Sequence, residues 1–166
     1  MDFESIEQIG DHGFQGFRTV SWLQTSACRE VPDEQGVYLV LRPERTHPTF
    51  LQQSTGGHFK GKDPAVPPAK LAGKWVNGPI VVYIGKAGRS EGRATLRSRL
   101  LAYMRFGQGE PVGHWGGRYI WQLAGSGDLI VCWKPTPEEE PAEVETRLIR
   151  DFKAKYGRLP FANLRH

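Results

Sequence analysis

Two short apolar runs organise this sequence: residues 36–41, which read GVYLVL, and residues 80–85, which read IVVYIG. Both runs are rich in β-branched and aromatic residues, so each predicts a strand. Each also places a tyrosine close to a glycine, Tyr38 in the first run and Tyr83 in the second. A glycine in a strand marks a position where another backbone or a phosphate can approach closely. The two runs therefore predict two strands that present two phenols.

The bulk composition predicts a single domain over residues 1–166. Hydrophobic residues make up 39% of the 166, enough for a sizeable core, while 20 glycines and 12 prolines imply many loops. A net charge of +4 and a pI near 9.2 favour a polyanionic partner without establishing one. No apolar run approaches the ~18 residues that span a bilayer. The start has no signal-peptide pattern, so we expect a soluble, cytoplasmic protein.

The cysteines and histidines do not form a recognisable metal site. Cys28 and Cys132 lie far apart, and neither belongs to a CxxC or Cys/His pattern, which excludes a disulfide framework or a zinc site as the organising feature. The histidines that could be ligands have no ligand spacing and are interpreted as loop residues: His47, His58 and His114. Only His114, beside Trp115 in a glycine-rich stretch, is a candidate for a DNA contact.

Two segments extend beyond the predicted core. Residues 1–30 mix aromatic and aliphatic residues with polar ones, which predicts a folded N-terminal extension. Residues 43–79 are rich in Pro, Gly, Lys and His and form a long insertion between the two strands. Such a segment either carries small elements of its own or becomes ordered on a ligand. Its lysines suit either a phosphate backbone or a solvated loop: Lys60, Lys62, Lys70 and Lys74.

The remaining periodicity predicts helices and a third strand. Residues 94–106 have helical spacing with leucines on one side, and residues 119–123 predict a short helix. Residues 129–133 predict a strand. A last helix is predicted from Pro137, with glutamates in its first turn, to a glycine stop at Gly157. The expected fold is α/β in the broad sense, more specifically α+β, with a small, mostly antiparallel three-stranded sheet flanked by helices.

A carboxylate falls within the apolar stripe of the last helix. At 100° per residue, Glu145 shares a sector with several apolar residues: Ala142, Leu148, Ile149, Phe152 and Tyr156. An ionised carboxylate directed toward a core is costly unless it is paired or holds a metal. Two readings remain open. Glu145 forms a structural ion pair with Arg99 or Lys86, or it is a metal ligand or a general acid or base.

The preceding helix carries two side chains that together could bind a phosphate. Arg99 and Tyr103 are four residues apart and so share a face at the border of its apolar side. The planar guanidinium of arginine matches phosphate oxygens geometrically. Neighbouring arginines, including Arg93 and Arg97, make a solvated charged face the competing interpretation.

In order along the chain, these residues resemble the motifs of the GIY-YIG nuclease superfamily, in particular its restriction-type and excision-repair-type catalytic domains. The matching elements are Gly36-Val37-Tyr38, Tyr83-Ile84-Gly85-Lys86-Ala87, Leu96-x-x-Arg99-x-x-x-Tyr103, Glu145-x-x-Leu148-Ile149-Arg150 and Pro160-Phe161-Ala162-Asn163. The sequence departs from the family at Val37, where isoleucine is usual, and in the long insertion.

The resemblance implies a DNA endonuclease that depends on one Mg²⁺ or Mn²⁺ held by Glu145. It implies Tyr38 as the general base and Tyr83 as the residue that orients water or phosphate, although the two roles are interchangeable on sequence grounds. The other implied catalytic residues are Lys86, Arg99, Tyr103 and Asn163. Apart from the resemblance, the candidate nucleic-acid contacts are Gly85, Lys86, Arg93, Arg97, Lys60 and Lys62.

Double-stranded DNA is the expected substrate, and a homodimer is compatible with the chain. Repair, mobile-element and toxin nucleases are alternatives within this class. A nucleic-acid-binding module without hydrolysis, or a basic domain whose Glu145 is only structural, are alternatives outside it.

Overall fold

The computed structural model describes residues 1–89 and 92–165. Its elements follow in the order α1 (Ile6–Asp11), β1 (Gln15–Thr19), α2 (Val20–Ser26), β2 (Gly36–Leu41), α3 (Pro68–Lys74), β3 (Val81–Ala87), α4 (Leu96–Gly107), η2 (Arg118–Gln122), η3 (Ser126–Asp128), β4 (Ile130–Pro135) and α5 (Pro141–Tyr156). None of the helices within these ranges has the length and apolar character needed to cross a membrane.

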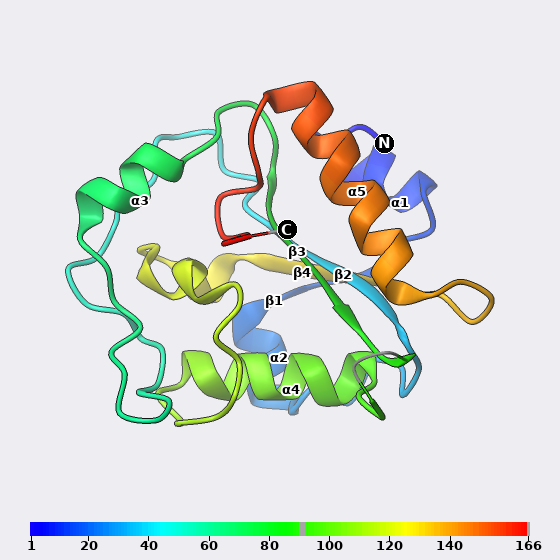
Figure 1. Cartoon of the computed structure of the whole chain (residues 1–166), viewed down its shortest axis with the longest axis horizontal. Coiled ribbons are helices and arrows are strands. Elements are labelled where there is room, and N and C mark those ends of the chain that lie inside the picture. The colour runs from blue at the N-terminus through cyan, green and yellow to red at the C-terminus, as the bar shows by residue number, and fades with distance from the viewer. Residues whose placement is uncertain (90–91, 166) are drawn as a thin grey trace.

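The fold is α+β, and its sheet has four antiparallel strands in the order β1-β4-β2-β3 (Figure 1). The expectation of three strands was therefore wrong, because β1 of the N-terminal extension pairs with β4. The sequence of β1 does not have the alternating pattern that would predict this strand. The register shifts between Gln15 and Arg18, and Gly16 and Phe17 both have positive φ angles, so the side chains do not alternate regularly. Any side chain at Gly16 would overlap the ring of Trp133.

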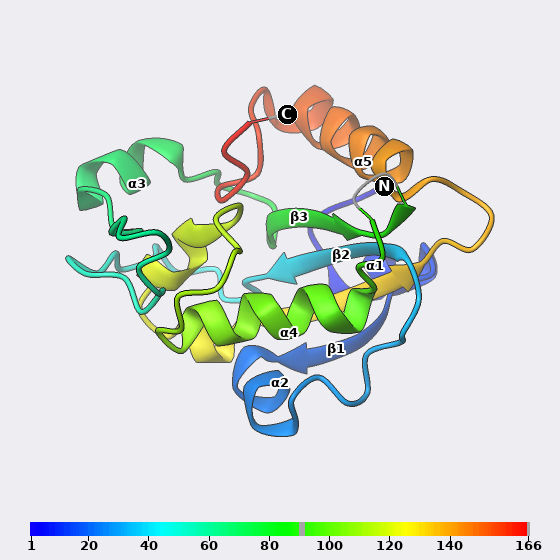
Figure 2. The same ribbon diagram turned by 60° about the horizontal axis from the view of Figure 1, so that its bottom comes forward.

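Strand β2 divides the core into two clusters, because every one of its residues is buried and successive side chains point to opposite faces. Val37, Leu39 and Leu41 pack with the cluster that includes Ile149 and Phe152 of α5. Tyr38 and Val40 pack with the cluster that includes residues of α4 and η2. Figure 2 shows the sheet between α5 on one side and α4 with α2 on the other.

The insertion between β2 and β3 carries its own helix, α3, and is fastened to the rest of the chain by Gln122. This buried side chain donates hydrogen bonds to the carbonyls of Leu51 (3.0 Å) and Val66 (2.8 Å) and accepts one from the Val66 amide (2.8 Å). The backbone amide of Thr55 adds a bond to the carbonyl of Trp121 (3.0 Å). Of the two sequence-based interpretations, the one with an element inside the insertion is confirmed.

The two long helices begin later than their apolar patterns suggested. Helix α4 begins after Thr95, whose side chain accepts from the Ser98 amide while the Ser98 hydroxyl accepts from the Thr95 amide, a reciprocal capping box. Helix α5 begins at Pro141 rather than Pro137. Proline is tolerated in the first helical turn, where its missing N–H is not needed. Gly157 ends α5 with φ +75°, as the sequence predicted.

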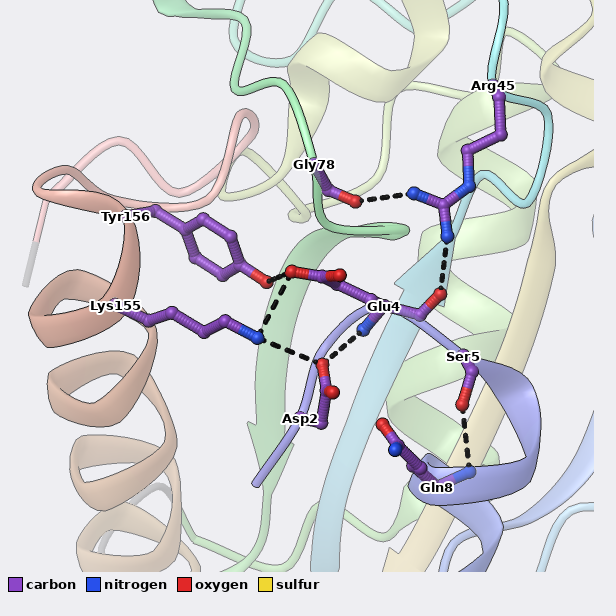
Figure 3. A network of polar contacts seen from close by, with 8 residues as sticks. All are labelled: Asp2, Glu4, Ser5, Gln8, Arg45, Gly78, Lys155 and Tyr156. Carbon is purple, nitrogen blue, oxygen red and sulfur yellow. Dashed lines mark hydrogen bonds and ion pairs between the residues drawn. The ribbon is translucent and has the colours of Figure 1, made fainter.

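The N-terminal segment is tied to the end of α5 by a small polar network (Figure 3). The Lys155 ammonium lies 3.1 Å from carboxylate oxygens of both Asp2 and Glu4, and the Tyr156 hydroxyl donates to Glu4 (3.0 Å). Arg45 of the insertion donates to the backbone carbonyls of Glu4 (2.9 Å) and Gly78 (2.8 Å). The network joins the N-terminal extension, the insertion and α5, segments far apart in the sequence.

Candidate active site

Three tyrosines meet on the α4 face of the sheet. Tyr38 of β2 and Tyr83 of β3 have ring centroids 6.0 Å apart, and Tyr103 of α4 lies 6.3 Å from the first and 5.6 Å from the second. All three are buried, and Tyr83 is the most exposed at 8%. The two predicted phenols therefore do lie together, and the Tyr103 ring completes the cluster.

The glycine of the second tripeptide accommodates a tyrosine ring. Gly85 is the cross-strand partner of Tyr38, and any side chain at this position would overlap the Tyr38 ring and hydroxyl. The sequence predicted that a backbone or a phosphate approaches Gly85, but the group that does so is the Tyr38 side chain. Gly85 itself is buried, so the structure does not place it at a surface that DNA reaches.

Glu145 and Lys86 form an ion pair at the edge of the sheet. The Lys86 ammonium lies 3.2 Å from the Glu145 carboxylate, and their side chains are 19% and 17% exposed. The carboxylate in the apolar stripe of α5 therefore has a cationic partner, one of the two that the sequence proposed. Both side chains keep some exposure, so a ligand from solvent can reach the pair.

The charges of Arg99 in α4 and Glu145 in α5 shift the pKa values of the two strand tyrosines. Burial raises the pKa of Tyr38 to about 12, while the positive charge of Arg99 lowers it and the charge of Glu145 raises it. Burial also raises the pKa of Tyr83 well above its usual range, and Tyr38 and Glu145 add to that shift. Both phenols are consequently protonated at neutral pH.

Asn163 fixes the outer strand of the sheet. Its side-chain oxygen accepts from the Ile84 amide (3.0 Å), and its side-chain nitrogen donates to the Ile84 carbonyl (2.9 Å). The amide of Ala162 also donates to the carbonyl of Val82 (2.8 Å). The C-terminal segment thus pairs with the backbone of β3 on both sides of Tyr83, and Asn163 positions the strand through the backbone of Ile84.

The segment after α4 closes over the tyrosine cluster. The Tyr103 hydroxyl donates to the carbonyl of Gly117 (2.6 Å), and a side chain at Gly117 would meet both Tyr103 and Tyr83. Gly117 also has a φ of +75°, a conformation that favours glycine. In this structure the Tyr103 hydroxyl is engaged by the backbone, which differs from the phosphate contact expected of it.

His114 is the residue of this region that sequence reasoning misplaced. Rather than lying on an exposed loop, it is 1% exposed, and its ring stacks on Tyr103 at 4.0 Å. Neither of its ring nitrogens has a hydrogen-bond partner within the described part of the chain. Burial holds the pKa of His114 well below its usual range, and Arg99 adds to that effect. The sequence around His114, with Gly113 and Trp115 on either side, has no periodic apolar pattern that could have predicted this burial.

The basic residues predicted to contact DNA lie at both ends of α4. Arg93 and Arg97 are exposed near its start, where the Arg97 guanidinium donates to the Val31 carbonyl (2.8 Å). Lys60 and Lys62 are exposed and lie near the end of the helix. A hydrogen bond from the amide of Gly57, in the same loop, to the carbonyl of Phe106 (2.9 Å) holds the loop there. At 1.5 Å per residue, the helix separates the two groups by about 18 Å.

The candidate site offers a divalent cation one carboxylate, that of Glu145. Among the described residues, no group of three or more His, Cys, Asp or Glu side chains gathers into a metal site. Mg²⁺ is nevertheless held in many proteins by one or two carboxylates, with water and substrate phosphate oxygens as its other ligands. Glu145 fits that arrangement as the single protein ligand, provided that Lys86 turns from the carboxylate toward a phosphate.

Comparisons with protein-family models, with curated proteins and with solved structures find no match for this chain. The charges of Arg99 and Glu145 influence both protonated strand phenols, and Glu145 pairs with the partly exposed Lys86 at the edge of the sheet. This arrangement suits an anionic substrate that can accept hydrogen bonds from hydroxyls and replace Glu145 as the partner of Lys86.

Proposed function

We propose that this protein is a divalent-metal-dependent endonuclease that hydrolyses DNA phosphodiester bonds. The observation that carries the proposal is the convergence of Tyr38, Tyr83, Lys86, Arg99 and Glu145 from four separate elements. The order of the motifs, which resembles that of GIY-YIG nucleases, supports the same conclusion. The net charge of +4 is consistent with a polyanionic substrate.

The proposed roles follow from what phosphodiester hydrolysis requires. Arg99 supplies a fork of hydrogen-bond donors for the oxygens of the phosphate, whose negative charge grows in the transition state. Glu145 holds one Mg²⁺ or Mn²⁺, which when bound supplies Lewis-acid charge beside the phosphate. Lys86, released from Glu145, contacts a phosphate oxygen. Asn163 keeps β3, and with it Tyr83, in place.

Tyr38 is the better candidate for the general base. Burial raises the pKa of both phenols; Arg99 is the main influence that opposes this effect at Tyr38, whereas the charges of Tyr38 and Glu145 add to it at Tyr83. Tyr83, which retains some exposure, is assigned to orient the attacking water or the phosphate through its hydroxyl. This division predicts a nicking rate that rises with pH, because a base with a high pKa is more often deprotonated in alkaline solution.

Plasmid nicking tests the proposal. Supercoiled plasmid is incubated with the pure protein and Mg²⁺ or Mn²⁺, and with three variants. Glu145→Gln and Arg99→Gln are expected to lower the nicking rate by about 100-fold or more, as the loss of a charged transition-state contact does. Glu143→Gln is the matched control, because Glu143 lies exposed on the same helix and is expected to keep the wild-type rate. Equal nicking by all four proteins would refute the assigned site.

Mapping the ends of the fragments then separates the classes of nuclease. Discrete ends on double-stranded DNA are expected of a restriction-type enzyme, whereas cutting confined to branched or damaged DNA is expected of a repair or mobile-element enzyme. Unrestricted degradation of nucleic acid is expected of a toxin.

A second candidate function is nucleic-acid binding without hydrolysis. Two observations favour it. The ion pair with Lys86 engages Glu145, the proposed metal ligand, and the tyrosine cluster is buried beneath Gly117. Salt-sensitive DNA binding, with no cleavage of plasmid, branched or single-stranded substrates in either metal, would support this function over the first.

A further inference from the structure

A tight hairpin turn in the insertion presents two lysines beside an aromatic ring. The turn runs from Phe59 to Lys62, whose amide donates to the Phe59 carbonyl (3.1 Å). Its central residues, Lys60 and Gly61, have φ angles of +52° and +72°. Glycine, asparagine and aspartate are the residues that usually occupy such positions, so a lysine here adopts an unfavourable backbone conformation. The turn holds its two ammonium groups on a short, constrained tip.

The tip faces the segment that covers the tyrosine cluster, and the two form a hollow. Phe59, Lys60, Lys62 and Trp115 line it, with a volume of about 230 Å³. Both aromatic side chains are only half-buried, and the lining includes no carboxylate. The Arg118 guanidinium lies 4.5 Å from the centre of the Trp115 ring, which adds a third cation next to the hollow.

The hollow adjoins the candidate active site through the backbone. Trp115 directly precedes Gly116, and a Cβ atom at Gly116 would lie 3.5 Å from the Tyr83 hydroxyl. Trp115, which lines the hollow, is therefore next in the chain to a residue whose backbone lies close to the Tyr83 hydroxyl. Aromatic side chains beside basic ones are the combination that binds single-stranded nucleic acid, since bases stack on the rings and phosphates contact the cations.

We propose that this hollow binds an unpaired nucleobase of a DNA strand, stacked on Trp115 and Phe59, with Lys60 and Lys62 on the adjoining phosphates. The proposal rests on the proposed function in that DNA is the ligand. It narrows the substrate to DNA with an unpaired segment next to the phosphate at the active site. A fully paired duplex keeps its bases stacked inside the helix and gains only the phosphate contacts.

Binding in the absence of metal tests this inference separately from cleavage. Fluorescence anisotropy is measured with labelled oligothymidine and with a blunt duplex of the same length, in buffer that contains a chelator. Wild-type protein is expected to bind oligothymidine more tightly than the duplex. Trp115→Ala is expected to weaken oligothymidine binding by about 5- to 100-fold, the usual loss for one stacking ring, and duplex binding by less than about 2-fold.

Two further variants control for folding and for charge. Trp22→Ala removes a tryptophan that is 49% exposed on α2, so it should change neither affinity. Trp115→Phe keeps an aromatic ring against Phe106 (6.3 Å between centroids) and should restore most of the binding that Trp115→Ala loses. The double variant Lys60→Gln/Lys62→Gln should lower the salt dependence of oligothymidine binding by about 1.4 in log–log slope, the value for two phosphate contacts on a single strand.

The outcomes distinguish this inference from the proposed function. Loss of both affinities in equal measure with Trp115→Ala, or a wild-type preference for the duplex, overturns the nucleobase site even if the protein nicks plasmid. Conversely, oligothymidine binding that depends on Trp115, without nicking in any metal, supports the nucleobase site and rejects the nuclease.

Discussion

The two faces of strand β2 are equally buried but chemically different. The face toward α5 presents Val37, Leu39 and Leu41 to an apolar cluster. The face toward α4 presents Tyr38 to Tyr83 and Tyr103, and Tyr103 in turn stacks on His114. Apolar burial stabilises a fold, whereas buried polar groups without partners cost stability. The α5 face is apolar up to its edge, where Lys86 pairs with Glu145, whereas the α4 face buries polar groups that lack partners among the described residues and so cost stability.

The largest expected effect tests the apolar face. Leu39→Ala removes a fully buried side chain from the centre of the sheet and leaves a cavity between β2 and α5. We expect the free energy of unfolding to fall by about 2–5 kcal/mol, measured by urea denaturation. Nicking per folded molecule should remain unchanged at low temperature. If nicking fell while the free energy of unfolding did not, the apolar face would affect the site as well as the stability of the fold.

A second variant tests the packing between Gly85 and Tyr38. Gly85→Ala places a methyl group where the Tyr38 ring lies, so the ring or the strand must shift. We expect a destabilisation of about 1–3 kcal/mol, as for other overpacked cores. The loss of activity should be larger than the stability loss alone explains. Gly73→Ala is the matched control, since nothing lies near a Cβ at that position in α3.

His114 tests whether the polar face costs stability. Because burial holds its pKa below about 6.5 in the folded state, the unfolded chain binds the proton more readily. Stability is therefore complete above about pH 6.5 and falls as the pH drops below it. His114→Phe keeps the stack on Tyr103 and removes two unpartnered nitrogens. Its free energy of unfolding at pH 7 should therefore equal that of the wild type or exceed it, by up to about 1 kcal/mol.

Denaturation at pH 7.5 and pH 5.5 measures this effect. Wild-type protein should lose more stability than His114→Phe between the two values, because only the wild type has this buried imidazole to protonate. An equal loss in both proteins would show that other groups carry the acid sensitivity.

The smallest expected change in stability accompanies a large change in activity. Tyr38→Phe removes one buried hydroxyl that lacks a hydrogen bond of good geometry in the described structure, so the free energy of unfolding should change by less than about 1 kcal/mol. Nicking should fall by about 100-fold or more if Tyr38 is the general base. Retained nicking with Tyr38→Phe, together with its loss in Tyr83→Phe, would exchange the roles of the two tyrosines.

The sequence predicted those elements whose side chains repeat regularly. Strands β2 and β3 and helices α4 and α5 were predicted within a few residues, because each has a continuous apolar run or an apolar stripe. Strand β1 was missed because its bulge at Gly16 and Phe17 interrupts the alternation. For the site, local patterns predicted that each of the two strands carries a tyrosine and that the Glu145 carboxylate needs a cation or a metal as its partner.

Local patterns by themselves determined which side chains are available: two strand tyrosines, an arginine helix and a glutamate in an apolar stripe. Only the tertiary structure decided that Lys86 is the partner of Glu145, that Gln122 fastens the insertion and that His114 is buried against Tyr103. The physical reason is that periodicity reports which face of an element is apolar. Contacts between segments far apart in the chain depend on how those faces pack, and no single segment encodes that packing.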